Sequence, residues 1–424
     1  MQKIARLSVL VFIFTIPWEN AFTISTLGSL ARIIGLGAAG IWIISVLFRM
    51  RLHKLQFFHI VVFSFVIFNM VSIFWTLDYD WSLARLKTYL QIGILAWILW
   101  DVFTTPESLR AAMQTFIFGG YVVIVSSFYN FVSGQTISQW EYGRFSGAGQ
   151  NAVELGLILS LSIPVAWHLA TTQTEGHGNN AIKIINFAFI PAALLAIVLT
   201  ASRTALITII PAMFYIIGTM SRIKPVYRFL IFTLFTVGVF IGQSFVPKAT
   251  LERLGTIGIS IAGGDLGGRL ALWKESFSIF KEHFLIGIGS GALNGASQLG
   301  AAAHNTFLSI LAELGVIGFL LFLAVLAIVF FRAINQPKSY SVLWLTVLSI
   351  WLFGVQSLTY EYAKSTWFFL NMIVISAAIW NQHNLLAEDI PISENPRVNL
   401  GTPRPIPQGK INFPERTTLK HKKV

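Results

Sequence analysis

Apolar runs of about 20 residues recur along the chain and are separated by short polar segments. A helix of about 20 apolar residues spans the roughly 30 Å hydrocarbon core of a bilayer. Because lipid offers no hydrogen-bonding partners, each span must satisfy its own backbone groups, as a helix does. Twelve runs have this character: 4–22, 27–48, 57–75, 83–103, 111–133, 151–171, 181–200, 203–220, 227–247, 304–331, 340–357 and 365–381. We therefore predict an all-α polytopic membrane protein with about 12 transmembrane helices.

The composition excludes a soluble globular protein. Hydrophobic residues make up 55% of the chain and charged residues only 11%, whereas about a quarter of a soluble domain is charged. The absence of cysteine excludes disulfides, a thiolate nucleophile and a cysteine metal site. A net charge of +12 would suggest nucleic acid as a partner of a soluble protein. Here membrane topology explains most of that charge, so we predict no nucleic-acid partner.

The Lys and Arg residues near the ends of the spans predict the orientation of the chain. Most of them fall on one side if both termini are cytoplasmic, as the positive-inside rule requires. The long segment 248–303, between the ninth and tenth spans, then faces the periplasm. Within it, Leu270 to His283 mixes apolar and charged residues in a pattern typical of an amphipathic helix at the membrane surface.

Two regions of different composition follow from this pattern. Residues 1–381 form the predicted transmembrane domain, with the periplasmic loop inserted in it. Residues 382–424 are rich in proline, poor in apolar residues and basic at the end. Such a segment cannot bury a core, so we predict a disordered cytoplasmic tail that contacts anionic lipid headgroups.

The most informative polar stretch lies between residues 263 and 318. It contains Gly263–Arg269, a glycine-rich run at 287–291, and His304-Asn305 followed after nine residues by Gly315-x-x-Gly318. The glycine run follows no predicted strand and lacks the lysine of a P-loop, so we reject a nucleotide site there. Shorter polar motifs precede this stretch: Gly143-Arg144-Phe145-Ser146-Gly147, Asn151 with Glu154, and Thr200-Ala201-Ser202-Arg203.

In their order and spacing these motifs resemble the O-antigen ligase and polymerase superfamily of bacterial envelope glycosyltransferases. The ligase branch, the lipopolysaccharide ligases, is the most similar, because its signature is His, then Asn, Ser or Gln, nine residues and GxxG. The resemblance implies transfer of a glycan from undecaprenyl diphosphate to the lipid A-core oligosaccharide. It places the reaction at the periplasmic face of the bacterial inner membrane, with inversion at the sugar and without metal, nucleotide or other cofactor.

His304 is the predicted general base. In the predicted topology only His283 and His304 lie on the periplasmic side, and an imidazole with a pKa near 6.5 suits proton abstraction at neutral pH. His304 opens an apolar run that we expect to form one helix of about 40 Å, longer than the hydrocarbon core is thick. The imidazole would therefore stand at the membrane surface. An interfacial capping histidine is the alternative, and Asn305 is a predicted substrate contact.

Cations on the same side predict a diphosphate site, since Arg presents a planar, permanently charged fork to phosphate. Arg203 and Arg269 are expected to stabilise the leaving group as catalytic residues. Five more residues are expected to contact the diphosphate or glycan: Arg144, Arg85, Lys87, Asn151 and Glu154. For each cation the alternative is an anchor in the lipid headgroups. Glu154 could equally form a structural pair.

Three other functions remain open from the sequence. A polymerase would join the donor to another lipid-linked glycan, and no motif records the choice of acceptor. A flippase for lipid-linked oligosaccharides would use similar cations, but transporters place their sites near the bilayer midplane, whereas these residues gather on one side. A purely structural membrane protein would need neither His304 nor the arginines.

Overall fold

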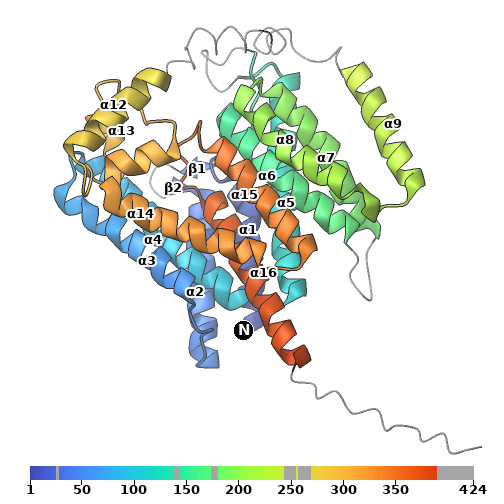
Figure 1. The fold of residues 1–424 in the computed structure, drawn as a ribbon, viewed down its shortest axis with the longest axis horizontal. Helices are drawn as coiled ribbons and strands as arrows, with labels where there is room; N and C mark the ends of the chain where they lie inside the picture. Colours follow the sequence, from blue (N-terminus) through green and yellow to red (C-terminus); the bar gives the residue numbers. More distant parts are fainter. Residues whose placement is uncertain (25–27, 137–142, 173–179, 243–254, 256–268, 389–424) are drawn as a thin grey trace, which may run out of the picture. The chain divides into compact units, whose positions relative to one another are not determined.

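The computed structural model describes residues 1–24, 28–136, 143–172, 180–242, 255 and 269–388 (Figure 1). The chain divides into two compact units, Met1–His383 and Asn384–Val424. Of the second unit the structure describes the end of one helix. The predicted motif residues Gly263 to Gly268 and the predicted tail from residue 389 onward lie outside the described residues.

Helices dominate the described residues. The α-helices are α1 (Gln2–Thr15), α2 (Leu30–Arg49), α3 (Phe57–Val71), α4 (Tyr79–Val102), α5 (Pro106–Val132), α6 (Ala152–Thr171), α7 (Asn180–Leu199), α8 (Arg203–Gly218), α9 (Pro225–Gly242), α12 (Arg269–Glu282), α13 (Leu293–Ala296), α14 (Thr306–Ile334), α15 (Lys338–Gly354) and α16 (Lys364–Glu388). Short 3₁₀ helices cover η1 (Ile16–Trp18), η2 (Ser72–Trp75) and η4 (Met220–Arg222). Strands β1 (Thr23–Ile24) and β2 (Gly28–Ser29) pair antiparallel, with Thr23 opposite Ser29.

A helix occupies each of the twelve predicted spans, and α12 coincides with the predicted amphipathic helix. Six helical segments among the described residues are long and apolar enough to cross a membrane: α2, α3 with η2, α5, α6, α7 and α14. Helices α8 and α15 are apolar but shorter. The chain is therefore an all-α, multi-pass membrane protein, and a count of twelve crossings stays a prediction.

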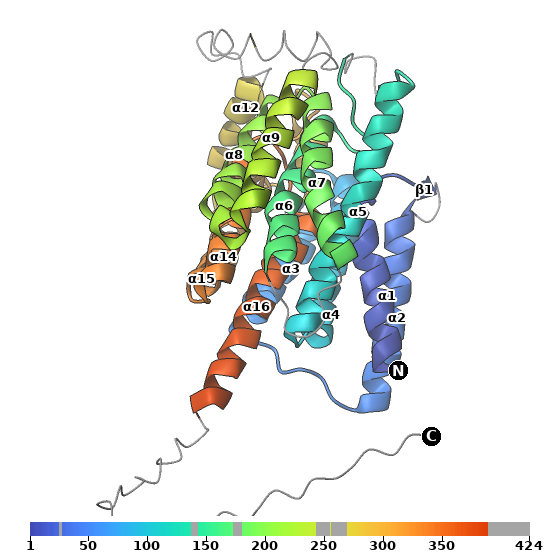
Figure 2. The same cartoon turned by 90° about the vertical axis from the view of Figure 1, so that its right-hand side faces the viewer.

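Helix α6 lies at the centre of the packing. It contacts α5, α7, α8 and α15 (Figure 2), and most of its residues are buried. Large side chains fill the core around it, among them Trp167, Trp344 and Trp367. Phe116 of α5 stacks on Phe368 of α16, with ring centroids 4.7 Å apart. The bundle is therefore held by close-packed apolar and aromatic side chains.

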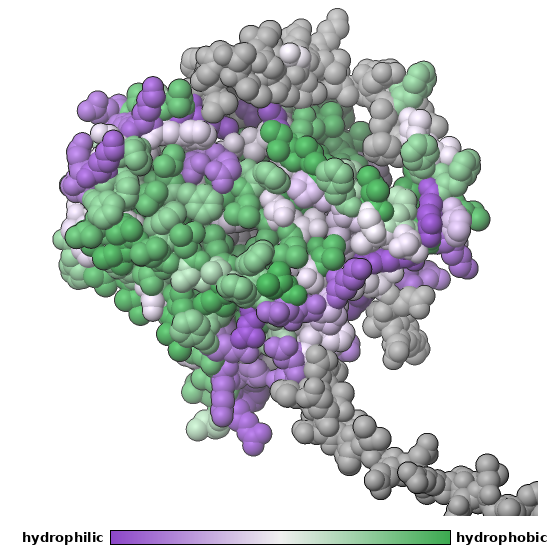
Figure 3. Space-filling model, viewed as in Figure 1, coloured by the Kyte–Doolittle hydropathy of each residue, from purple (hydrophilic) through white to green (hydrophobic). Residues whose placement is uncertain are grey.

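Large apolar side chains also cover much of the outside. Figure 3 shows a broad hydrophobic area over α3, α4 and α14, with hydrophilic residues above and below it. Phe74 is 85% exposed and Phe48 72% exposed. Soluble monomers rarely expose apolar patches of this extent, and surface of this kind is what lipid tails cover.

Helix α14 is broken at Gly315, which has φ 62° and ψ −165°. The expected single helix of about 40 Å is therefore wrong. An unbroken helix would bond Val316 N–H to Ala312 C=O and Ile317 N–H to Glu313 C=O. Instead, backbone groups of residues 284–289 form hydrogen bonds with these two N–H groups and these two C=O groups.

The four replacement bonds are regular in length. Ile288 N donates to the Ala312 oxygen at 3.1 Å and Gly289 N to the Glu313 oxygen at 2.8 Å. In return, Val316 N donates to the Phe284 oxygen at 2.9 Å and Ile317 N to the Leu285 oxygen at 3.2 Å. An unpaired backbone group in an apolar environment costs several kcal/mol, about 2–7. The 284–289 segment therefore removes most of the free-energy cost of breaking the helix.

Glycine is required where the two chains cross. A Cβ on Gly315 would lie within 3.0 Å of the Leu285 and Ile286 backbone, and a Cβ on Gly287 within 3.0 Å of the Glu313 and Leu314 backbone. Both glycines also have positive φ, which L side chains seldom adopt. The glycine-rich run and the GxxG motif are thus two sides of one backbone contact.

Gly315→Ala should destabilise the protein by more than about 1 kcal/mol, because alanine cannot adopt φ 62° without strain and its Cβ meets backbone atoms. Thermal unfolding in detergent, followed by tryptophan fluorescence, measures the change. Gly40→Ala in α2 is the matched control, since a Cβ there meets nothing within 4 Å. Equal melting temperatures for the two variants would show that the crossing is not under steric constraint.

Candidate functional site

His304 lies in the turn immediately before α14, with its imidazole accessible to solvent. Its φ is +47°, which is uncommon for a residue other than glycine and costs about 1–3 kcal/mol. Such strain persists only where the surroundings hold the residue in place. The neighbours of His304 must therefore hold its backbone in this conformation.

Asn305 fixes the chain directly after His304. It is the N-cap of α14: its side-chain oxygen accepts hydrogen bonds from Phe307 N at 3.0 Å and Leu308 N at 3.1 Å. Its side-chain nitrogen donates to the Gln356 side-chain oxygen at 3.2 Å. Asn residues are strong N-caps for this reason. Asn305 thus both starts the helix and joins it to the loop that follows α15.

Arg269 approaches the same place from another helix. It is the first residue of α12, and its Nη1 donates to Ser357 Oγ at 2.8 Å. Partial burial of the imidazole lowers the pKa of His304, and the positive charge of Arg269 lowers it further. The structure thus brings His304, Asn305 and Arg269 together around the turn after α15.

That turn, residues 355–363 between α15 and α16, contacts most parts of the site, and we call it the 355–363 loop. Gln356 and Ser357 of this loop bond Asn305 and Arg269, and other loop residues bond Thr306, the first residue of α14. Thr306 Oγ1 donates to the Leu358 oxygen at 2.9 Å and accepts from Tyr360 N at 2.8 Å. Thr306 N donates to the Val355 oxygen at 3.0 Å. The loop therefore sets where α14, and hence His304, begins.

Arg85 of α4 is buried against the same loop. Its side chain is 8% exposed, and its Nη1 lies 3.4 Å from Glu361 Oε1. Its guanidinium carbon lies 3.4 Å from the centroid of the Tyr362 ring, a favourable cation–π geometry. Burial raises the pKa of Glu361 to about 7, although the neighbouring Arg85 opposes the shift. Arg85 is thus part of a buried charge cluster beneath the loop.

The other charges near α4 are arranged differently. Glu313 of α14 accepts a hydrogen bond from Gly291 N at 2.8 Å and so holds the polar chain that follows the 284–289 segment. Lys87 is exposed, because two residues along a helix turn the side chain by about 200°. The structure therefore does not bring Lys87 together with Arg85.

A second group of predicted residues surrounds the starts of α6 and α8. Arg144 Nε donates to the Thr200 oxygen at 3.2 Å, and Phe145 N to the Leu199 oxygen at 2.9 Å. These bonds lay the chain before α6 along the turn before α8. Ser202 caps α8 by accepting from Ala205 N at 3.3 Å, which makes Arg203 the first helical residue.

The first turns of α6 and α8 lie side by side. Asn151 caps α6, accepting from Val153 N at 3.0 Å and Glu154 N at 2.9 Å. A Cβ on Gly156 would lie within 3.0 Å of the Ala205 Cβ, so the two helices are in close contact there. Two adjacent helix N-termini, with Arg144 and Arg203 beside them, form an environment that favours an anion.

The 355–363 loop also reaches this second group. Burial raises the pKa of Tyr360 and of Tyr362, and the negative charge of Glu154 contributes in both cases. Glu154 therefore lies near the loop that holds Arg269, Asn305 and Arg85. At the loop's end, Lys364 forms an ion pair with Glu19.

Sequence reasoning missed the 355–363 loop. A signal was present, because Glu361 and Lys364 are charged residues between two apolar spans, and charges at such places are usually paired or functional. Among the described residues, no group of three or more His, Cys, Asp or Glu side chains could hold a metal ion. The roles predicted for the nine site residues stay predictions.

Residues 187–323 match the family model described as O-Antigen ligase. The matched part runs from α7 into α14 and contains Arg203, Arg269, His304, Asn305 and Gly315. This segment is therefore similar to the O-antigen ligase family. This match confirms the resemblance to the O-antigen ligase and polymerase superfamily. No curated protein matches the chain. The 355–363 loop lies beyond the O-antigen ligase match, although it contacts Arg269 and Asn305 within it.

Substitution of Asn305 separates helix capping from substrate contact. Asn305→Ala should lose about 1 kcal/mol of stability and lower activity, because the turn that presents His304 loosens. Asn305→Ser keeps a capping oxygen, so its melting temperature and activity should stay near those of the wild-type protein. If Asn305→Ser keeps its stability but loses activity, the amide group acts beyond helix capping, through its hydrogen bond to Gln356 or through contact with substrate.

Proposed function

We propose that the protein is a membrane glycosyltransferase, an O-antigen ligase that transfers a glycan from undecaprenyl diphosphate to the lipid A-core oligosaccharide. The observation that carries the proposal is the pairing of His304 with Arg269 around one loop, inside the segment that matches the O-antigen ligase family. A base beside a permanent cation suits the transfer of a sugar from a diphosphate.

In the proposed reaction His304 accepts the proton of an acceptor hydroxyl as its oxygen attacks the anomeric carbon of the donor. The new glycosidic C–O bond forms while the C–O bond to the diphosphate breaks, in one inverting displacement. Undecaprenyl diphosphate leaves with the bonding electrons. General base catalysis of this kind contributes about 10²–10⁴ in rate. The lowered pKa of His304 keeps the imidazole neutral and ready to accept a proton at neutral pH.

The cations are proposed to neutralise the diphosphate. Arg203, at the first turn of α8, and Arg269 would hold the leaving group, where a placed donor is worth about 10²–10³ in rate. Arg144 and the capped starts of α6 and α8, with Asn151 and Glu154, would complete the diphosphate and glycan site. Arg85 would act through the 355–363 loop. Lys87 would meet the donor at the exposed face of α4.

The proposed topology places this chemistry in the bacterial inner membrane. Twelve crossings with cytoplasmic termini would put the segment 248–303 and His304 at the periplasmic face, where a lipid-linked donor meets lipid A-core. The prenyl chain would lie against the apolar helix surfaces of Figure 3. The tail, 382–424, would remain cytoplasmic.

His304→Ala should reduce glycan transfer by about 10²–10⁴ and leave the protein folded, because the imidazole is solvent-accessible. The assay mixes purified protein, undecaprenyl-diphosphate glycan and lipid A-core in detergent with EDTA, and follows the size of lipid A on a gel. His283→Ala, at the end of α12, is the control and should transfer normally.

The products of that assay also separate the rival functions. A ladder on lipid A that depends on His304 supports ligation. Elongation of the donor glycan with lipid A unchanged would identify a polymerase. If neither product forms with wild-type protein, the ligase assignment fails and a flippase becomes the better account. Near-normal transfer by His304→Ala would refute the assignment of His304 as the general base.

The pH dependence tests the environment of His304. Partial burial and Arg269 hold its pKa below the ordinary 6.5, so the neutral base persists to lower pH. The acid limb of kcat/KM should therefore fall below pH 6.5. Arg269→Gln removes one of the two causes, and its acid limb should move to higher pH, whatever its effect on the maximal rate. An unmoved or lower limb would contradict the coupling.

A further inference from the structure

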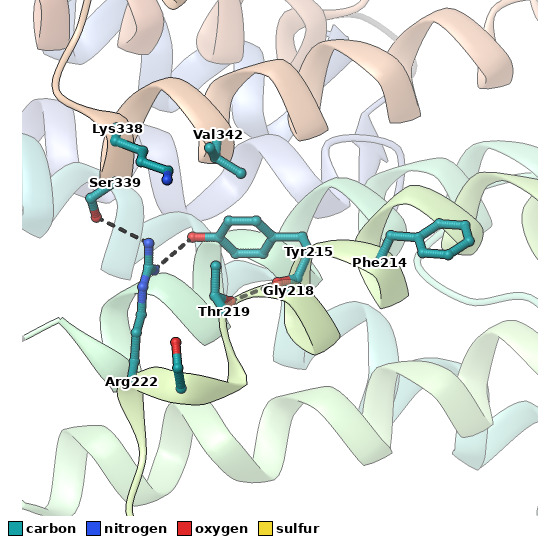
Figure 4. A pocket seen from close by; sticks show the side chains of 9 residues that line it. Phe214, Tyr215, Gly218, Thr219, Arg222, Lys338, Ser339 and Val342 are labelled. Atoms are coloured by element: carbon teal, nitrogen blue, oxygen red, sulfur yellow. Dashed lines mark hydrogen bonds between the residues drawn. The ribbon is translucent and has the colours of Figure 1, made fainter.

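A basic cavity lies between the end of α8 and the start of α15 (Figure 4). Its volume is about 430 Å³, within the range of about 300–1,000 Å³ that is usual for small-ligand sites. Two cations, Arg222 and Lys338, line it together with the hydroxyl groups of Tyr215, Thr219 and Ser339. The proposed reaction uses none of these residues.

The cavity is distinct from the candidate glycosyltransferase site. Helix α8 has 16 residues and is therefore about 24 Å long, with Arg203 at one end and the cavity at the other. Helix α15 packs against α8; it begins at the cavity and ends at the 355–363 loop. The two sites thus lie at opposite ends of the same helix pair.

The cations in the cavity are arranged for an anion. Arg222 Nη1 donates to the Tyr215 hydroxyl at 3.1 Å and Nη2 to Ser339 Oγ at 3.3 Å, and Figure 4 shows the guanidinium held between them. Both partners are neutral. Among the described residues, neither Arg222 nor Lys338 forms an ion pair with a carboxylate. Within the described part of the chain, no carboxylate therefore neutralises the positive charge of the cavity.

The network behind Arg222 keeps it in place. The Tyr215 hydroxyl also lies 3.1 Å from Nδ1 of the buried His168, and Thr219 Oγ1 accepts a hydrogen bond from the Trp167 indole at 2.8 Å. Both partners belong to α6, the central helix. A guanidinium oriented in advance loses little entropy on binding a planar pair of phosphate oxygens.

Apolar surface borders the cavity. Phe214 and Val342 line it and are 71% and 37% exposed, so in a multi-pass membrane protein they face lipid. Basic pockets between transmembrane helices bind phosphate-bearing lipid headgroups. We propose that this cavity binds a phosphate group, that of an anionic membrane lipid whose acyl chains lie along Phe214 and Val342, with free phosphate as the other source of the same chemistry.

Native mass spectrometry of the detergent-purified full chain tests the proposal with phosphatidylglycerol and phosphatidylcholine as probes. The wild-type protein should retain phosphatidylglycerol at about tenfold lower lipid concentration than phosphatidylcholine, a difference of about 1.4 kcal/mol. The variant Arg222→Gln/Lys338→Gln should lose that preference. Arg51→Gln/Lys54→Gln, which removes two exposed cations elsewhere, should keep it.

Gly218→Leu tests the cavity without changing charge. Gly218 lines the cavity, and a Cβ there meets nothing within 4 Å, so the leucine enters open space and the fold should persist. Its binding of phosphatidylglycerol should fall as in the double variant. This variant decides the matter even if the double variant fails to fold.

Inorganic phosphate identifies the source. If phosphatidylglycerol raises the melting temperature and inorganic phosphate does not, the ligand is a lipid headgroup. If inorganic phosphate alone raises it, and Gly218→Leu abolishes the effect, the site takes free phosphate. The proposal fails if the wild-type protein retains both lipids equally and inorganic phosphate does not change its melting temperature. It also fails if the cavity variants bind phosphatidylglycerol as well as the wild-type protein does.

Discussion

The exchange of backbone hydrogen bonds at Gly315 is the constraint on which the site depends. An apolar helix cannot break inside a membrane protein unless other groups take over its free N–H and C=O groups. Here the 284–289 segment supplies two donors and two acceptors, and all four bonds are 2.8–3.2 Å long. The break and the segment are therefore inseparable. Together they hold the chain between α12 and α14, which carries His304 near its end, and they fix the end of α12, the helix that begins at Arg269.

The 355–363 loop is the second organising feature. It receives Asn305 through Gln356, Arg269 through Ser357 and Arg85 through Glu361. Arg85 and Glu361 are 276 residues apart in the chain, so α4 and the last two helices meet at one place. A buried ion pair contributes little net stability compared with apolar packing. Its effect here is on geometry. Arg85 holds the loop at Glu361, while Asn305 and Thr306 hold it at Gln356, Leu358 and Tyr360.

The helices could be predicted from the sequence because lipid imposes a simple rule on length and hydropathy. The predicted span 57–75, for example, coincides with α3 and η2, and the amphipathic pattern at 270–283 coincides with α12. The break at Gly315 could not be predicted in this way, since the bonds that stabilise it come from residues 284–289, in a different segment of the chain. The 355–363 loop was missed for the same reason. Its role comes from contacts with distant helices, and local hydropathy records only that Glu361 and Lys364 are charged. His304 and Arg269 could be predicted as site residues because a sequence motif, and not a contact, indicated them, and their roles stay predictions.

The hydrogen bonds between the 284–289 segment and α14 join main-chain atoms only, while Ile288 adds a buried apolar contact with Ala312. Leu285 and Ile286 provide a carbonyl oxygen and a close approach to Gly315, while their side chains are 61% and 39% exposed. Neither side chain takes part in the hydrogen bonds. The size and polarity of the side chains at positions 285 and 286 can therefore change while the helix break and the start of α14 stay the same.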